Sequence, residues 1–151
     1  MITIFKSEIH STKKPAVFKT TLEAKTLKTS KMLSIMNTVN MTSNDKDFYG
    51  KYEKDTIAIT RIRRISLLRF LPKLIITFPE IEKSLKFHVK LGFFSLMALI
   101  FLGLALIINI SEFVRTSRFT EDFLTILIFI GVFFSFVLIE LMMYKQKFNN
   151  Y

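Results

Sequence analysis

The stretch that decides the fold of this chain is LGFFSLMALIFLGLALIINIS, from Leu91 to Ser111, in which 21 consecutive residues carry no charge. A helix of that length covers roughly 30 Å, the thickness of the hydrocarbon core of a bilayer. A second apolar run, FLTILIFIGVFFSFVLIELMMY from Phe123 to Tyr144, follows after a short polar connection. Two such runs in close succession predict a transmembrane helical hairpin rather than the buried helices of a soluble core.

Glu140 is the one charged residue within the second run. It lies about one helical turn from the end of the run, and Lys145 and Lys147 follow it closely. We expect these three residues to anchor the helix at the membrane interface, with a proton or ion site as the less favoured alternative. Gly131 and Ser135 form a pair of small residues four positions apart. This spacing predicts close helix packing, either within the hairpin or between copies of the chain.

The orientation of the hairpin follows from the basic residues that flank it, which are more numerous on the cytoplasmic side of membrane proteins. Only Arg115 and Arg118 lie in the connection, residues 112–122. Within about 20 residues of the outer ends of the two spans there are six lysines: Lys73, Lys83, Lys86, Lys90, Lys145 and Lys147. We therefore expect a cell (inner or plasma) membrane protein with an outer loop at 112–122, a cytoplasmic tail at 145–151 and both termini in the cytoplasm.

The charge of the chain is concentrated before the first apolar run. Residues 1–90 hold 18 of the 22 Lys and Arg residues but 8 of the 12 Asp and Glu residues, which accounts for the whole formal charge of +10. The partner that such a domain favours is the anionic headgroup layer, which attracts each surface Lys or Arg by about 1 kcal/mol. Nucleic acid is a less favoured partner, because no aromatic stacking platform accompanies the charges. A simple abundance of lysine is the remaining alternative.

Residues 1–90 predict a small basic α+β domain in two parts. In residues 1–43 we expect a short strand near Ile2 and Ile4 and a helix between Phe18 and Met36. Residues 44–90 predict strands at Phe48–Glu53, Thr56–Ile62 and Leu74–Phe78, and for residues 80–90 a strand that runs into the first span is favoured over a helix. The fold class is an α+β membrane protein: a small antiparallel β-rich domain with one helix, a first span at 91–111 and a second at 123–144.

The order of features from Phe48 onward resembles a group of small uncharacterised bacterial membrane proteins. These features are Gly50, the alternating run that ends in Arg61 and Arg63, the segment Arg69-Phe70-Leu71-Pro72, a strand and a membrane segment. The resemblance covers about residues 48–110. It implies an antiparallel meander on the cytoplasmic side of a membrane hairpin, and it implies no activity. The bacterial membrane-flanked pleckstrin-homology-like domains are a more distant comparison.

The composition excludes several kinds of chemistry. With no Cys there are no disulfides, thiolate metal sites or cysteine nucleophiles, and the two histidines have no ligand-like neighbours. Four glycines make a phosphate-binding loop improbable. We therefore expect no catalytic, cofactor-binding or metal-binding residues and no bound cofactor.

One cluster of side chains has some specificity, and it is basic: Arg61, Arg63, Arg64, Arg69 and Lys73. On an extended strand, Arg61 and Arg63 share a face and lie roughly 6.6 Å apart. If that face met the bilayer, the guanidinium groups would contact lipid phosphates; a solvated sheet face is the plainer alternative. The function that we expect is a non-enzymatic, membrane-anchored interaction or accessory module. The alternatives are a subunit of a small oligomeric pore or transporter and a membrane enzyme.

Overall fold

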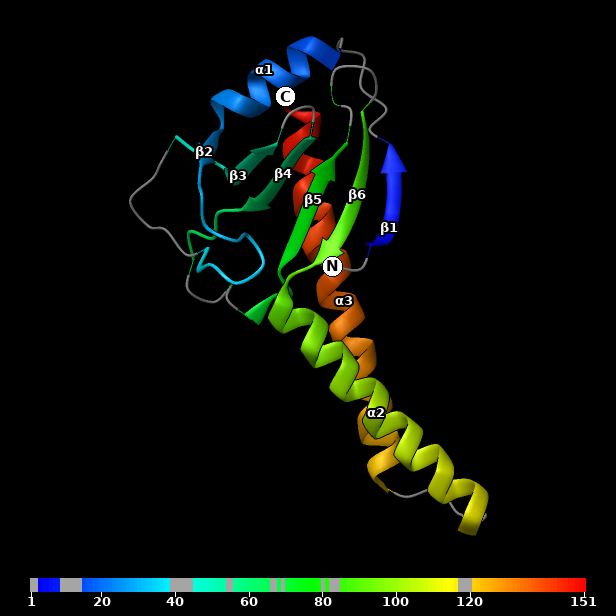
Figure 1. Ribbon diagram of the computed structural model, residues 1–151. Coiled ribbons are helices and arrows are strands. Elements are labelled where there is room, and N and C mark those ends of the chain that lie inside the picture. Colours follow the sequence, from blue (N-terminus) through cyan, green and yellow to red (C-terminus); the bar gives the residue numbers. More distant parts are fainter. Residues whose placement is uncertain are drawn as a thin grey trace.

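The fold is an α+β arrangement in which a six-stranded sheet stands at one end of a pair of long helices (Figure 1). The computed structural model describes residues 3–8, 15–38, 45–53, 56–65, 68, 70–79, 81, 85–116 and 121–151. The strands are β1 (Thr3–Glu8), β2 (Thr26–Lys28), β3 (Phe48–Glu53), β4 (Thr56–Arg61), β5 (Leu74–Phe78) and β6 (Lys86–Leu91). The helices are α1 (Pro15–Ala24), α2 (Phe93–Thr116) and α3 (Glu121–Asn149).

The expected antiparallel meander forms the centre of the sheet, whose order is β1-β6-β5-β4-β3-β2. β3 to β6 are consecutive antiparallel neighbours, β1 pairs antiparallel with β6, and β2 pairs parallel with β3. The strands expected at Phe48–Glu53 and Leu74–Phe78 are confirmed, and β4 ends one residue before the expected boundary. Residues 86–91 form a strand, as the alternation of apolar residues favoured.

The two faces of the sheet are covered differently. One face, which we call the inner face, carries the apolar core residues Phe48, Ile57, Ile59, Leu74, Ile76, Phe78, Phe87, Val89 and Leu91. On the other face, the segment around Met32 and Leu33 lies over Ile75 and Thr77. Because β5 is covered from both sides, all five of its residues are buried. Its sequence is accordingly a continuous apolar run rather than an alternating one.

Helix α1 is shorter than the helix expected between Phe18 and Met36. It begins with Pro15, a residue suited to the first helical turn, and it places Phe18 and Leu22 in the core. The helix ends at Ala24 because the chain then pairs in parallel with β3, where Thr26 is opposite Phe48. The expectation of helix through Met36 was therefore wrong, since strand pairing takes over a segment with weak helical periodicity.

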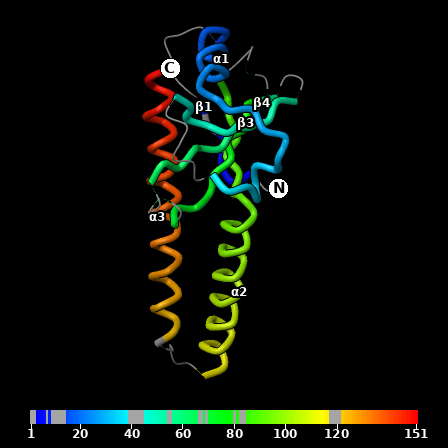
Figure 2. Tube along the Cα trace, turned by 90° about the vertical axis from the view of Figure 1, so that its left-hand side faces the viewer, coloured from blue at the N-terminus to red at the C-terminus, as the bar shows by residue number. Residues whose placement is uncertain are grey.

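Both long helices are long and apolar enough to cross a membrane. They run side by side and away from the sheet (Figures 1 and 2). α2 continues five residues past the apolar run, to Thr116, and α3 begins at Glu121, so most of the expected loop at 112–122 is helical. Charged residues in the last turn of a helix can point outward without disturbing the helix. The end of the apolar run at Ser111 therefore did not mark the end of α2.

Helix α3 is longer than a membrane span requires. Its 29 residues correspond to about 43 Å. Figure 2 shows α3 continuing past the start of α2 and alongside the sheet, so that the C-terminus lies near α1. Phe148 and Tyr151 are buried in the core of the domain. Residues 145–151, which were expected as a cytoplasmic tail, are helical through Asn149, and their aromatic side chains complete the core beneath the inner face of the sheet.

Candidate functional site at the junction of the sheet and helix α3

Three buried charged residues, Glu140, Arg61 and Arg63, lie where α3 meets the end of β4. The carboxylate of Glu140 accepts two hydrogen bonds from the guanidinium group of Arg61, at 3.2 Å from Nε and 2.6 Å from Nη2. The Arg63 Nη2 atom lies 3.8 Å from Glu140 Oε1, the oxygen that accepts the hydrogen bond from Arg61 Nε. The side chains of Glu140 and Arg61 are only 1% and 7% exposed. This is a buried, bidentate ion pair between residues that are 79 positions apart in the chain.

Tyr144 lies one helical turn after Glu140 and ties the same helix to two strands. Its hydroxyl group accepts a hydrogen bond from the Arg61 backbone N–H at 2.6 Å and donates one to the Leu74 carbonyl oxygen at 2.9 Å. The ladder between β4 and β5 has its last registered pair at Ile59 and Ile76. Tyr144 therefore makes hydrogen bonds to two backbone groups at the point where the strands separate.

Aromatic packing continues the contact up the helix. The Phe148 ring lies 5.8 Å from the rings of Phe18, Phe48 and Phe78, and the Tyr144 ring stacks on Phe48 at 5.7 Å. Such pairs add about 0.5–1.5 kcal/mol each beyond the burial of their surface. The last turns of α3 therefore belong to the core of the domain, although the helix begins in the apolar hairpin.

Asp47, just before β3, holds the C-terminal end of the chain. It accepts hydrogen bonds from Lys147 and, at 2.6 Å, from the Tyr151 hydroxyl group, and it lies 3.5 Å from Arg64. Desolvation by itself would raise the pKa of Asp47, but these hydrogen bonds and the charges of Lys147 and Arg64 outweigh it and hold the pKa below its usual value. Desolvation and the bond to Asp47 both raise the pKa of Tyr151. Asp47 is thus a charged anchor at neutral pH.

A pocket of about 320 Å³ opens beside the junction, where α2 begins. The Lys73 Nζ atom donates to the Met36 carbonyl oxygen at 2.5 Å, and the Lys73 backbone N–H donates to the Ser95 hydroxyl oxygen at 2.8 Å. Desolvation and the nearby charge of Arg63 lower the pKa of Lys73 to about 8. Among the described residues Lys73 makes no ion pair.

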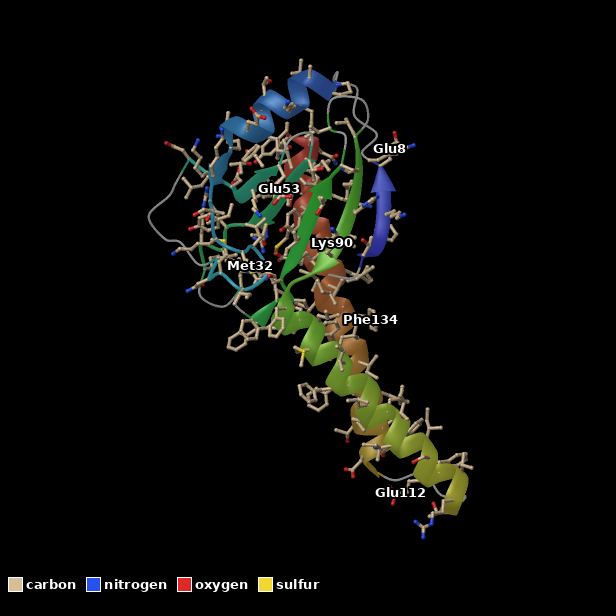
Figure 3. The ribbon with its side chains drawn as sticks, viewed as in Figure 1. Glu8, Met32, Glu53, Lys90, Glu112 and Phe134 are labelled. Carbon is tan, nitrogen blue, oxygen red and sulfur yellow. The ribbon has the colours of Figure 1, made fainter. Side chains whose placement is uncertain are left out.

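A second groove, of about 250 Å³, crosses the outer face of the sheet. Its lining includes Met32, Lys51, Glu53, Thr77 and Lys90. Met32, Glu53 and Lys90 are labelled on this side of the sheet in Figure 3, far from Glu112 at the distal end of the hairpin. The lining of the groove combines apolar side chains with the charged side chains of Lys51, Glu53 and Lys90.

The structure places the expected basic cluster differently from the prediction. Arg61 and Arg63 do share a face, but both are buried, with 6% exposure, and they point to Glu140 rather than to open surface. Arg61 and Arg63 therefore form neither the lipid-facing surface nor the solvated sheet face that the sequence left open, because α3 covers that face. Arg64 is exposed and lies beside Asp47, Lys73 lines the pocket, and Arg69 lies outside the described residues.

Glu140 also differs from the prediction, which placed it at the membrane interface as an anchor together with the lysines that follow it. A signal for its actual role was present: Glu140, Tyr144, Phe148 and Tyr151 are spaced by four, four and three residues and form one helical stripe. The small pair Gly131 and Ser135 lies on an exposed part of α3, where Ser135 donates to the Gly131 carbonyl oxygen at 2.8 Å. A Cβ atom added at Gly131 would meet nothing within 4 Å, so α2 does not pack against this glycine.

Within the part of the chain that the structure describes, no three His, Asp or Glu side chains group as they would around a metal ion. Comparisons with protein-family models, with curated proteins and with solved structures found no match. The arrangement of the junction itself is therefore what supports a function.

Proposed function

We propose that this chain is a two-span integral membrane protein that holds its α+β domain in a fixed position at the membrane surface. In this proposal the domain is a non-enzymatic interaction or accessory module on the cytoplasmic side of the cell membrane. The observation that carries the proposal is helix α3. One continuous helix supplies apolar surface for the hairpin in its first part and the Glu140, Tyr144 and Phe148 contacts of the domain core in its second part.

The exposed side chains of the hairpin support insertion. Phe101, Ile107, Leu124 and Ile128 are between 58% and 64% exposed, and many large apolar neighbours share this exposure. Only 6% of the apolar window of either long helix is buried within the molecule. A continuous apolar surface of this extent is rare on proteins surrounded by water, and a bilayer would cover it.

The shared helix also supports rigid attachment. A domain tied to its span by a flexible linker would sample many positions above the membrane. Here α3 needs no linker, and at the other side only Gly92 separates β6 from α2. The outer sheet face and its groove would then keep a constant height and direction relative to the bilayer, which suits a module that presents a surface to a membrane partner.

Cysteine labelling tests the topology, because the natural chain contains no cysteine and each introduced one is unique. Lys86→Cys reports on the domain and Glu112→Cys on the distal end of the hairpin. In sealed inside-out vesicles we expect a membrane-impermeant maleimide to label the first variant and not the second, and in right-side-out vesicles the reverse. Labelling of both variants from the same side, or release of the protein by alkaline carbonate, would reject the proposal.

The groove tests the role as an interaction module. A partner that co-purifies with the wild-type chain in mild detergent should be lost from a variant with Lys51→Glu and Glu53→Lys, which inverts the rim charges. A variant with Glu8→Lys and Lys86→Glu, a charge exchange between paired residues of β1 and β6 outside the groove, is the matched control. Retention of the partner by the groove variant would exclude the outer sheet face as the contact surface.

A further inference from the structure

The pocket at the start of α2 carries an inference beyond anchoring. Its lining includes Lys73, Arg63, Ser95, Phe94 and Leu71. The first residues of α2 form its wall, so in an inserted hairpin the pocket lies at the level of the lipid headgroups. This position rests on the proposed function, because it requires α2 to span the membrane.

The charges around the pocket are unbalanced. Arg61 and Arg63 both lie against the carboxylate of Glu140, whereas the ammonium group of Lys73 forms no ion pair with a described residue. The Arg61 guanidinium group donates a hydrogen bond to each oxygen of the Glu140 carboxylate, and the Arg63 Nη2 atom lies 3.8 Å from Oε1. The lowered pKa of Lys73 has the same origin, since its ammonium group is partly desolvated beside Arg63. A partly buried excess of positive charge is unfavourable, and an anion in the pocket would relieve it.

Hydrogen-bond donors in the pocket suit a phosphate group. The Lys73 ammonium group has three donors and uses one of them on the Met36 carbonyl oxygen. The Ser95 hydroxyl group accepts a bond from the Lys73 backbone N–H, and its own proton has no acceptor among the described residues. Both donors lie at the N-terminal end of α2, which carries the positive end of the helix dipole.

The surroundings of the pocket are apolar, as the acyl side of a lipid requires. Phe94 and Ile35 line it and are 66% and 53% exposed. The connection between β4 and β5, which supplies Leu71 and Lys73 to the pocket, also carries Ile65 and Phe70, which are 62% and 81% exposed. A free phosphate ion would make no use of these side chains, whereas a phospholipid would use both the donors and the apolar rim.

We propose that this pocket binds the headgroup phosphate of an anionic phospholipid, with the Lys73 ammonium group and the Ser95 hydroxyl group as donors and Arg63 as a supporting charge. The lipid then completes the charge balance of the junction between α2, the sheet and α3. Anionic lipid contact is thereby assigned to one pocket of defined shape instead of an open basic face.

Lipid binding to the full chain, delipidated in a neutral detergent, tests the proposal. The probes are dioleoyl phosphatidylglycerol, dioleoyl phosphatidylcholine and inorganic phosphate, and the measurements are lipid adducts in native mass spectrometry and the shift in unfolding temperature. We expect phosphatidylglycerol to bind at least 10-fold more tightly than phosphatidylcholine and to raise the unfolding temperature. Equal binding of the two lipids would overturn the proposal, and equal stabilisation by inorganic phosphate would overturn the assignment to a lipid.

Substitutions locate the site. Because Lys73→Gln removes a charge-assisted hydrogen bond to the phosphate, we expect it to lower the affinity for phosphatidylglycerol about 10- to 100-fold. The matched control is Lys86→Gln, which makes the same charge change at the far end of β6, about 17 Å from Leu91. Equal affinities for these two variants would overturn the proposal. Should Lys73→Gln not fold, Ser95→Ala must weaken binding while Lys73→Arg retains it, and the opposite order would overturn the proposal.

This experiment is separate from the topology test. It is carried out in detergent and does not depend on which side of a membrane the domain occupies. Phosphatidylglycerol binding that is lost with Lys73 would therefore stand even if the cysteine labels contradicted the proposed topology, and the reverse combination would remove the lipid site alone.

Discussion

The sharpest test of the junction is the removal of the Glu140 carboxylate. In the structure this group is 1% exposed and neutralises Arg61 directly and Arg63 at longer range. Glu140→Gln would keep the size of the side chain and leave two buried guanidinium groups without a negative charge. Breaking a buried ion pair from one side costs about 3–5 kcal/mol, much of it the penalty of the charge left behind.

That loss is large relative to the stability of a small protein. At about 2–4 °C per kcal/mol for a chain of this size, we expect the unfolding temperature to fall by about 6–20 °C. Thermal unfolding of the full chain in dodecyl maltoside, followed by far-ultraviolet circular dichroism, measures this shift. Glu112→Gln is the matched control, because this substitution removes the same charge at an exposed position of α2. It should change the free energy of unfolding by less than about 0.5 kcal/mol, as is usual for surface substitutions.

A double-mutant cycle separates the pair from the rest of the junction. Arg61→Leu and Glu140→Leu should each destabilise the protein, and the double variant should be about 1–3 kcal/mol more stable than the sum of the two losses predicts. If Glu140 were instead a solvated anchor at the interface, Glu140→Gln would cost at most about 1 kcal/mol and the cycle would show no coupling. That result would refute the reasoning about α3.

The remaining predictions concern the same domain, and unfolding measurements check each of them. Tyr144→Phe should cost about 1–3 kcal/mol, because the buried Arg61 backbone N–H loses its acceptor, whereas the Leu74 carbonyl oxygen keeps the hydrogen bond from the Thr60 hydroxyl group; a stability equal to wild type would contradict the bridge. The pKa of Asp47 is lower in the folded state than its unfolded value of 3.8. The ionised carboxylate therefore stabilises the fold fully above pH 3.8, and this stabilisation is lost as the pH falls through the pKa of the folded state. Asp47→Asn should therefore be less stable than wild type at pH 7, with a difference that shrinks in acid; a constant difference would count against this. The pKa of Lys73 is lowered from 10.5 to about 8 in the folded state, so between pH 8 and pH 10.5 the unfolded state binds more protons than the folded state. The stability of wild type relative to Lys73→Met should therefore rise as the pH is raised through that range. Gly50→Ala should cost about 1–3 kcal/mol, because a Cβ atom there would lie 2.3 Å from a threonine methyl group in β2. A Cβ atom at Gly131 would meet nothing within 4 Å, so Gly131→Ala should be neutral or stabilising. Equal effects of the two substitutions would contradict the packing.

The strands and the long helices were predictable because their signals are local. β3 and β5 follow from short apolar and β-branched runs bounded by turn residues, and α2 follows from an uninterrupted apolar segment. Errors arose where an element extends beyond its signal. α3 continues nine residues past Glu140 because the sheet accepts its aromatic stripe, and nothing near Glu140 in the sequence indicates where that sheet lies.

The candidate site could be predicted only as a set of residue types. Arg61, Arg63 and Lys73 stand out in the sequence as a basic cluster, but an alternating strand does not reveal which of its faces another element covers. Covered by α3, Arg61 and Arg63 become partners of a buried carboxylate. Lys73 lies on the following strand connection, faces the pocket at the start of α2, and keeps a charge that no described carboxylate neutralises.

By itself the sequence determined that two apolar segments of membrane-spanning length follow a basic, strand-rich domain, since length, hydropathy and alternation are properties of neighbouring residues. Only the tertiary structure decided that the second apolar helix runs on into the domain and that Glu140 meets Arg61 across 79 residues. The physical reason is that a buried charge is stable only beside its partner, and the partner's position depends on how the sheet and the helix pack rather than on any local pattern.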